Sequence, residues 1–410
     1  MLTRAKARLR AHALMRPLRS SLRAARPHLP PIIYIGGILG TQIYDRAGQR
    51  FTWGSAKGLL RHDWDPLGFA PGSPHHHRAL LNKQLHEFNI VPGLISSVIT
   101  RDVLNALEVG LGYREHVDLF FLGYDWRDDY RRLGARIENE IQRLRLQFGQ
   151  DQQVILIGQS VANLGLRHWL RQASPDFRAA VRKWYAFGPP WLGTWNAVHM
   201  LQEGCWPASK LVNGFSAEAV ARCPSSWQLL PAESRLCDRH GNLVAGFDIF
   251  DANHWADNGL PSHIPNLQKW LDMGRTFARE VSGTQASDAE VPQTWFANDR
   301  NLAVTRAVQG QAGSPALTTV QAIRKKAPDA MQSATERGDD HLPLRHLTDR
   351  ACGPLVRDLD AMPWGHNAVL IGQAHDHRAQ INHAPNLQAL AQDIAALSKT
   401  PSPRNQGPKT

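Results

Sequence analysis

The sequence has no apolar run long enough to cross a bilayer. The apolar stretch at residues 30–44 is short and is interrupted by proline and glycine, so it cannot span a hydrocarbon core. The Arg-rich segment before it lacks the apolar centre of a secretory signal. The compartment stays unknown on these grounds, and we expect a protein of the cytoplasm or of a membrane periphery, without a spanning helix.

Acidic residues are missing from the first 31 positions, which carry eight Lys or Arg, and three more basic residues follow from Lys399 onward. These two ends account for the whole net charge of +11, so the body of the chain is close to neutral. A protein that binds nucleic acid across a folded face should be basic in its body. We therefore expect no nucleic-acid partner. Residues 1–30 predict either a disordered basic tail or a basic helix that lies on an anionic membrane surface.

Cysteine is scarce, and its four positions fit neither a disulfide framework nor a metal motif. Thiols are the expected state, although Cys205 and Cys223 are the pair to consider in an exported protein. The tract His75-His76-His77 has no Cys or acidic partner at ligand spacing, which favours a solvated loop over a metal site. We expect no metal and no cofactor.

Short apolar runs alternate with helix-like segments along most of the chain. Such alternation predicts an α/β fold, with a mostly parallel central sheet flanked by helices through right-handed crossovers. Apolar positions at steps of three and four predict a helix that ends at Gly149. The predicted strands are residues 31–35, 117–121, 154–157, 184–187 and 294–297, and the predicted helices are 133–148, 161–172 and 387–397.

The alternation is lost from Trp191 to Val291, where Trp, Cys, Pro and Asn are frequent. This stretch predicts an inserted cap region. Residues 309–335 are small and polar, which favours a surface excursion. The predicted organisation is a basic segment (1–30), a first core part (31–190), the cap (191–291), a second core part (292–398) and a basic tail (399–410).

One turn carries a chemical motif. The strand at 154–157 runs directly into Gly158-Gln159-Ser160-Val161-Ala162 and then into a helix, as in the G-x-S-x-G nucleophile elbow, with Ala162 in place of the last glycine. A serine on such a turn projects its oxygen above the sheet. The alternative is a strand-ending turn with an incidental serine. We predict Ser160 as a nucleophile.

A serine nucleophile needs donors for the oxyanion that forms on its substrate. The glycine-rich turn Gly36-Gly37-Ile38-Leu39-Gly40 follows the first predicted strand, where backbone N–H groups can face a substrate oxygen. One donor in such enzymes comes from this loop and the other from the residue after the nucleophile. We assign them to the N–H groups of Ile38 and Val161. A tight turn without a catalytic role is the alternative.

Several sequence blocks resemble the lecithin–cholesterol acyltransferase family of the α/β-hydrolase superfamily, which includes lysosomal phospholipase and phospholipid–diacylglycerol acyltransferase. They occur in the family's order, although Gln159 stands where His is more usual. The blocks are Gly36–Ile43 with Trp53 after it, Gly123–Arg127 (Gly-Tyr-Asp-Trp-Arg), Gly158–Leu164, Phe187–Gly193 and Ser226–Pro231. The resemblance implies an α/β-hydrolase fold with a cap and an acyl pocket, with residues 54–90 in the place of a lid.

The resemblance also implies the acid and the base. The family's acid lies in a Gly-Asp turn, which matches Asp339, with Asp340 as the alternative. The base should lie on a loop before the last helix, and His366 fits that place. The order Ser, Asp, His is that of the α/β-hydrolases. Other histidines stand in the same region, namely His341, His346, His375, His377 and His383.

The expected function is a serine acyl hydrolase or O-acyltransferase that acts on a lipid ester, with Trp191 and Gly37 as substrate-binding residues. Cap tryptophans suit a lipid–water boundary or a protein core equally well. Asp125 and Arg127 are expected to form a buried ion pair. The expected partners are a lipid or other acyl ester, and a membrane surface. Two alternatives remain: a catalytically inactive scaffold that binds lipid or a partner, and an esterase of non-lipid esters.

Overall fold

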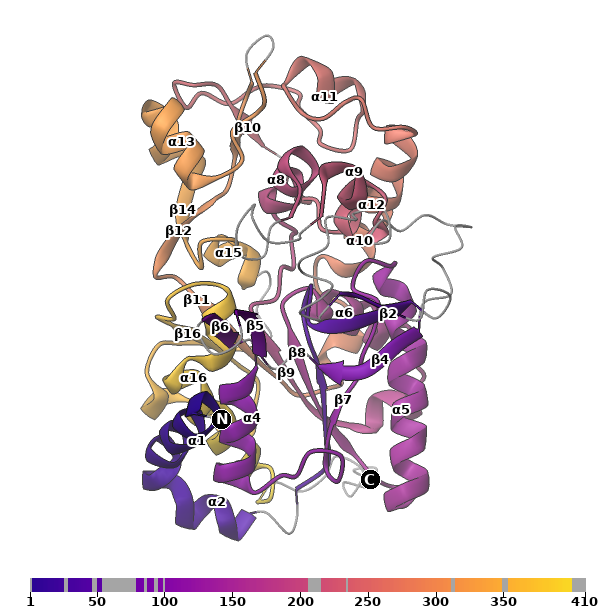
Figure 1. Cartoon of the computed structure of the whole chain (residues 1–410), viewed down its shortest axis with the longest axis vertical. Helices are drawn as coiled ribbons and strands as arrows, with labels where there is room; N and C mark the ends of the chain where they lie inside the picture. Colours follow the sequence, from indigo (N-terminus) through magenta and orange to yellow (C-terminus); the bar gives the residue numbers. More distant parts are fainter. Residues whose placement is uncertain are drawn as a thin grey trace.

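A seven-stranded parallel sheet forms the centre of the computed structural model (Figure 1). The structure describes residues 2–25, 29–45, 50–53, 79–84, 87–91, 95–98, 100–205, 215–233, 235–310, 314–348 and 353–399. From one edge of the sheet to the other, the strands are β7 (Leu119–Phe121), β1 (Ile32–Ile35), β8 (Val154–Gln159), β9 (Val181–Phe187), β11 (Gln293–Asn298), β16 (Ala368–Gly372) and β15 (Leu355–Val356). All neighbouring strands pair in parallel, as predicted.

The strands are apolar on both faces, as a sheet covered by helices on both sides requires. In β1, Ile33 and Ile35 belong to one hydrophobic core, while Ile32 and Tyr34 belong to the other. This alternation follows from the period of two in a strand. The continuous apolar runs that predicted buried strands are therefore explained by two separate cores.

Helices cover each face of the sheet. The first core is closed by α5 (Leu133–Phe148), α6 (Ala162–Gln172) and α12 (Leu267–Val281), and the second by α4 (Arg101–Ala106) and α16 (Ala384–Ala396). The predicted helix that ends before Gly149 is confirmed: Gly149 has φ +113° and its N–H donates to the carbonyl of Arg145 at 2.9 Å. No helix in the described part of the chain is long and apolar enough to cross a membrane.

The prediction of a disordered N-terminal tail is wrong for its described residues. They form α1 (Leu2–Met15), a helical turn η1 (Arg16–Leu18) and α2 (Arg19–Ala25), which pack on α4 and α16 on the second face (Figure 1). Met15 and Leu22 are buried, and both lie against Gly110, which leaves room for them. One face of these helices, with the buried residues Ala11, Met15, Leu22 and Ala25, docks on the domain, while residues 8–10 stay exposed.

The predicted cap is present and lies at one end of the sheet (Figure 1). It leaves the core after β9 and returns at β11. Its elements are α8 (Trp195–Glu203), α9 (Ala217–Ala221), α10 (Pro224–Gln228), β10 (Leu236–Cys237) and α11 (Asn253–Asp257). The helix α12 then leads back to the core.

A second excursion, between β11 and β16, also joins the cap. The excursion expected at residues 309–335 lies within it, so residues 292–398 are not all part of the core. Strand β13 (Ala307–Val308) pairs with β10 of the cap, and β12 (Asn301–Val304) pairs antiparallel with β14 (Thr335–Gly338). The excursion also contains α13 (Val320–Lys326), η8 (Pro328–Ala330), α14 (Met331–Ala334) and α15 (Leu344–Leu347). Its small and polar composition hid this pairing, because two-residue strands leave no period to detect.

The remaining elements are short. They are β2 (Thr41–Asp45), β3 (Arg50–Trp53), β4 (Ala79–Gln84), β5 (Glu87–Val91), β6 (Ile95–Val98), η5 (Leu107–Leu111), η6 (Tyr130–Arg132), α7 (Pro175–Ala179), η7 (Ala286–Ala289), η9 (Leu359–Ala361) and η10 (Arg378–Asn382). Most of the lid-like segment at 54–90, the tract His75–His77 and the tail from residue 400 lie outside the described residues.

Candidate active site

The turn between β8 and α6 places Ser160 in a left-handed conformation with φ +51°. Such a backbone is costly for a residue with a side chain and is kept where the surroundings hold it. Here the Ser160 N–H donates to the carbonyl of Phe187 in β9 at 2.8 Å. A Cβ at Gly37 would lie 3.0 Å from the Ser160 Cβ, and Ala162 is fully buried. The small residues around Ser160 are therefore required by close packing, and Ala162 satisfies that requirement as the last residue of the motif.

Asn163 ties this turn to the sheet, a role that the motif did not reveal. Its Nδ2 donates to the carbonyls of Ser160 at 3.0 Å, Gly158 at 3.2 Å and Phe187 at 3.3 Å. Its Oδ1 accepts from the indole N–H of Trp184 at 3.1 Å. A Cβ at Gly158 would lie 2.1 Å from that oxygen, which is why glycine stands there.

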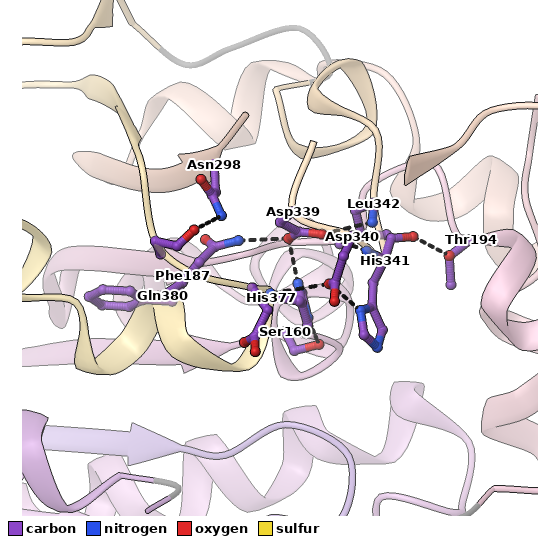
Figure 2. A network of polar contacts seen from close by, with 12 residues as sticks. Ser160, Phe187, Thr194, Asn298, Asp339, Asp340, His341, Leu342, His377 and Gln380 are labelled. Atoms are coloured by element: carbon purple, nitrogen blue, oxygen red, sulfur yellow. Dashed lines mark hydrogen bonds and ion pairs between the residues drawn. The ribbon is translucent and has the colours of Figure 1, made fainter. Parts of the chain in front are cut away.

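His377 is the histidine that lies beside Ser160 (Figure 2). The Ser160 Oγ is 2.8 Å from Nε2 of His377, and Nδ1 of His377 is 2.5 Å from Oδ2 of Asp339. Ser160 follows β8, His377 follows β16 and Asp339 follows β14. The carboxyl ends of β8 and β16 lie at the same edge of the parallel sheet, and the second excursion brings Asp339 to it. The three side chains form a continuous line of acid, imidazole and hydroxyl.

The structure does not bring His366 to this line, so its assignment as base is wrong. His366 is exposed and precedes β16, at the amino edge of the sheet, whereas Ser160 is at the carboxyl edge. Only its backbone is engaged: the His366 carbonyl accepts from Nζ of Lys183 at 2.7 Å. Lys183 forms a fully buried ion pair with Asp393 at 2.6 Å. The loop around His366 therefore has a structural partner.

Asp339 lies where the sequence placed it, and its carboxylate is fully buried among donors. Its Oδ1 accepts the backbone N–H groups of His341 at 3.1 Å and Leu342 at 2.7 Å. Its Oδ2 accepts from His377 and from Nε2 of Gln380 at 2.6 Å (Figure 2). These donors fix the carboxylate on the side of the imidazole that faces away from Ser160.

Two opposing effects act on the imidazole of His377, which is largely buried. Burial by itself lowers the pKa of His377, but the charge and hydrogen bond of Asp339 raise it, as do the charges of Asp340 and Asp376. The net result is a pKa of His377 above its ordinary value. A positive charge on this ring is thus stabilised by three carboxylates.

A second histidine near the line has a structural role. His346 is fully buried, and its Nδ1 lies 2.9 Å from the carbonyl of Gly193. Burial lowers the pKa of His346 to about 4, so the ring is neutral. Its carbonyl accepts the N–H of Trp191 at 3.1 Å, which fastens the start of the cap.

The glycine-rich turn lies directly against Ser160. The Gly40 N–H donates to the carbonyl of Gly37 at 3.0 Å, and Leu39 has φ +65°, which closes a tight turn around Ile38. The indole N–H of Trp53 donates to the Leu39 carbonyl at 2.9 Å. Ile38 and Val161 thus lie in two turns that approach each other at Gly37 and Ser160. Their role as oxyanion donors remains a prediction.

Trp191 lies in the core, which contradicts its assignment to substrate binding. It is buried, and its ring packs on Trp184 and Trp295 with centroids 5.7 and 4.8 Å apart. The guanidinium of Arg167 lies 4.5 Å from the centroid of its ring. Trp195 and Trp227 are also fully buried, and Trp206 lies outside the described residues. The described cap tryptophans therefore hold the cap together.

The expected ion pair between Asp125 and Arg127 is confirmed. The two side chains form a bidentate contact, with Nε to Oδ1 at 2.8 Å and Nη2 to Oδ2 at 2.6 Å, and Arg127 is fully buried. Next to it, the Trp126 indole donates to the carbonyl of Thr41 at 3.1 Å. This segment supports the strand that follows the glycine-rich turn. In the described part of the chain, no group of three His, Cys, Asp or Glu could hold a metal.

The architecture, a parallel seven-stranded sheet covered by helices with an inserted cap, is that of the α/β-hydrolase fold. Residues 93–258 match the family model described as lecithin:cholesterol acyltransferase, so the resemblance predicted from the sequence is confirmed over that range. No curated protein matches the chain in sequence.

The chain is also similar to solved structures at low identity. A chain of the Tle4–Tli4 complex is 15% identical, with a TM-score of 0.52 over 90% of this chain and 98% of that one. The mature Bacillus licheniformis lipase BlEst2 is 11% identical, with a TM-score of 0.41 over 89% and 93%. The Staphylococcus hyicus lipase is 10% identical, with a TM-score of 0.39 over 90% and 96%. The first of these three supports a shared fold and nothing more.

Proposed function

We propose that the protein is a serine acyl hydrolase or O-acyltransferase that acts on a lipid ester through an acyl-Ser160 intermediate. The observation that carries the proposal is the line from Ser160 through His377 to Asp339, with contacts of 2.8 and 2.5 Å. The match to the lecithin:cholesterol acyltransferase family supports an ester of a lipid as the substrate class. An intact line of this kind favours an enzyme over an inactive scaffold.

In the first half of the reaction, Ser160 attacks the ester carbonyl. The bond between Oγ and the carbonyl carbon forms while the hydroxyl proton moves to Nε2 of His377. Asp339 holds the Nδ1–H tautomer and stabilises the imidazolium. When the tetrahedral intermediate collapses, the ester C–O bond breaks and His377 returns the proton to the leaving alcohol.

In the second half, an acceptor attacks the acyl-Ser160 ester. Water or an alcohol gives its proton to His377 as its oxygen bonds to the acyl carbon. The bond to Ser160 Oγ then breaks, and the serine recovers the proton. Hydrolysis and acyl transfer therefore use the same groups and differ only in which acceptor reaches the site.

The negative oxygen of each tetrahedral intermediate needs donors. In this proposal they are the N–H groups of Ile38 and Val161, because the turns that carry them meet at Gly37 and Ser160. The left-handed Leu39 and its bond to Trp53 keep the first turn in place before the substrate arrives. Gly37 is required here because a side chain would press on the nucleophile.

Trapping the acyl-enzyme tests the proposal. Purified protein is mixed with p-nitrophenyl esters from acetate to palmitate, quenched in acid and weighed by mass spectrometry. We expect an acyl adduct on the peptide that contains Ser160, with a faster burst for the longer chains, and none in Ser160→Ala. Full esterase activity in folded Ser160→Ala would rule out the mechanism. A burst that is fastest for acetate would favour an esterase of non-lipid esters.

A further inference from the structure

A second pair of an aspartate and a histidine lies beside the catalytic line. Asp340 and His341 directly follow Asp339, and the Oδ1 of Asp340 lies 2.5 Å from Nδ1 of His341. The same oxygen accepts the backbone N–H of His377 at 3.3 Å. Figure 2 shows the Asp340 carboxylate between His377 and the side chain of His341. One carboxylate oxygen thus joins the second imidazole to the loop that carries the first.

The ring of His341 also contacts the ring of His377. Their centroids are 5.4 Å apart and their planes are inclined by 24°, so the two imidazoles are stacked. The backbone of His341 is fixed from the cap side, because Thr194 Oγ1 donates to its carbonyl at 2.8 Å. The His341 ring therefore stacks on one face of the His377 ring. Asp340 holds the His341 ring, and Thr194 holds its backbone.

Asp340 adopts a backbone that an aspartate reaches only at a cost. Its φ is +77°, in the left-handed region that glycine enters freely. Strain of this kind persists where the surrounding structure makes use of it. What the strained backbone provides here is the position of the carboxylate, between the His341 ring and the His377 N–H. A glycine would relax the turn but would lose that bridge.

We propose that Asp340 and His341 form a positioning pair that keeps the imidazole of His377 in line with Ser160. Asp339 alone fixes one ring nitrogen, which leaves the ring free to tilt about that bond. Stacking on the His341 ring limits this tilt. The hydrogen bond that the backbone N–H of His377 donates to Asp340 fixes the backbone from which the imidazole extends. On the edge of the ring, Gly188 leaves just enough room, since a Cβ there would lie 2.9 Å from Cε1 of His377.

This inference rests on the proposed role of Ser160, and the test separates the two. The rate of inactivation by a fluorophosphonate is measured against pH for wild type, Asp340→Gly, Asp340→Asn, His341→Phe and His341→Ala. The exposed His375, two residues before His377, supplies the matched control His375→Ala. Thermal unfolding is followed for every variant. If Ser160→Ala labels as fast as wild type, the proposed function fails, whatever the other variants do.

The positioning role predicts an order of rates. Asp340→Gly and His341→Ala should label about tenfold more slowly than wild type, since small displacements of a catalytic group cost that much or more. The labelling rate of His341→Phe should stay within about threefold of wild type, because phenylalanine keeps a flat ring stacked on His377. Asp340→Gly should melt no lower than wild type, since it relieves the strained backbone. His375→Ala should label like wild type.

The pH profile gives a readout that a merely structural role would not move. The titratable groups around His377 are Asp339, Asp340 and His341 on the loop after β14, and Asp376 on its own loop. The charge of Asp340 contributes to the raised pKa of His377. Asp340→Asn should therefore move the acid limb of the profile to lower pH, while His341→Phe should leave the shift from Asp340 in place. Wild-type rates and an unmoved limb in Asp340→Asn and Asp340→Gly would overturn the proposal, as would a His341→Phe variant as slow as His341→Ala.

Discussion

The two ends of strand β16 each hold a histidine and a buried aspartate, and they use them differently. At the carboxyl end, Asp339 binds a ring nitrogen of His377, whose other nitrogen faces Ser160. At the amino end, Asp393 is paired with Lys183, and Lys183 donates to the backbone carbonyl of His366 rather than to its ring. The ring of the first histidine lies within hydrogen-bond distance of the Ser160 hydroxyl. The ring of the second lies in solvent, at the opposite edge of the sheet.

The comparison shows that the end of the strand at which a histidine lies decides whether its ring reaches Ser160. The residues next to it in the sequence matter less. Catalytic groups of an open parallel sheet gather outside the carboxyl ends of its strands. The amino-end loop is instead the place where a buried charge network closes the fold: Thr294 Oγ1 donates to Asp393 at 2.9 Å, and the Gly365 N–H also donates to Asp393. The turn Trp364-Gly365-His366-Asn367 therefore has a structural role.

The largest difference in activity should come from replacing each of the two histidines, His377 and His366, by alanine. His377→Ala removes the proposed base, so we expect kcat/KM for a p-nitrophenyl ester to fall by a factor on the order of a thousand or more. His366→Ala removes a solvent-exposed ring, so we expect a change below about twofold. Steady-state kinetics on both variants measures this difference. Equal losses in the two would erase the distinction between the ends of β16.

The second largest effect on activity should come from replacing the proposed acid, Asp339. Asp339→Asn keeps the size of the side chain but loses the charge that holds the Nδ1–H tautomer of His377, and we expect a loss of about a hundredfold to ten-thousandfold in kcat. The corresponding change at the other end, Asp393→Asn, should leave the kcat of folded protein within about twofold. Active-site titration, which counts folded molecules, is needed to compare the two. An Asp393→Asn protein with an intact fold and a hundredfold lower kcat would contradict the account.

The amino end should be more sensitive in stability. Lys183→Met leaves the buried charge of Asp393 without its partner, which should lower the free energy of unfolding by about 3–5 kcal/mol. Adding Asp393→Leu should restore part of that loss, since no unpaired charge remains. Urea denaturation of the single and double variants measures both effects. A single variant as stable as wild type would show that the pair does not close the fold.

The smallest effect is a pH dependence with opposite signs for activity and stability. The proposed base must be neutral, so activity should rise as pH rises through the pKa of His377, which lies above its ordinary value. A histidine whose pKa is raised on folding stabilises the protein fully below its unfolded pKa, and this contribution is lost as pH rises through the folded pKa. Unfolding by urea at several pH values should show this trend in wild type and not in His377→Ala. A wild-type stability that rises through the same range would be inconsistent with the raised pKa.

Much of this fold follows from the sequence by simple periodicity. The apolar runs predicted β1, β7, β8, β9 and β11, and the steps of three and four predicted α5, because burial on both faces leaves a continuous pattern. A helix was one of two alternatives for the N-terminal segment, but its docking on the domain was missed because the arginines conceal the apolar residues around Met15 and Leu22. An excursion was expected at residues 309–335, but its pairing with the cap was missed because the strands are too short to show a period.

The candidate site was predictable where it depends on local geometry. Ser160 lies on a turn whose shape requires particular neighbours, and such requirements are visible in sequence. Asp339 was located by the resemblance, through its Gly-Asp turn. Which histidine reaches Ser160 depends on the end of the strand from which its loop leaves. That end could have been inferred only by first locating β16 at residues 368–372. With that strand in place, a position after it would have favoured His377 over His366.

The measurement that tests the central claim most directly is labelling with a fluorophosphonate, followed by peptide mapping, in wild type, His377→Ala and His366→Ala. The account predicts label on Ser160 in wild type and in His366→Ala, and almost none in His377→Ala. Label that persists in His377→Ala and disappears in folded His366→Ala would contradict it. Absence of label from folded wild type would contradict the nucleophile itself.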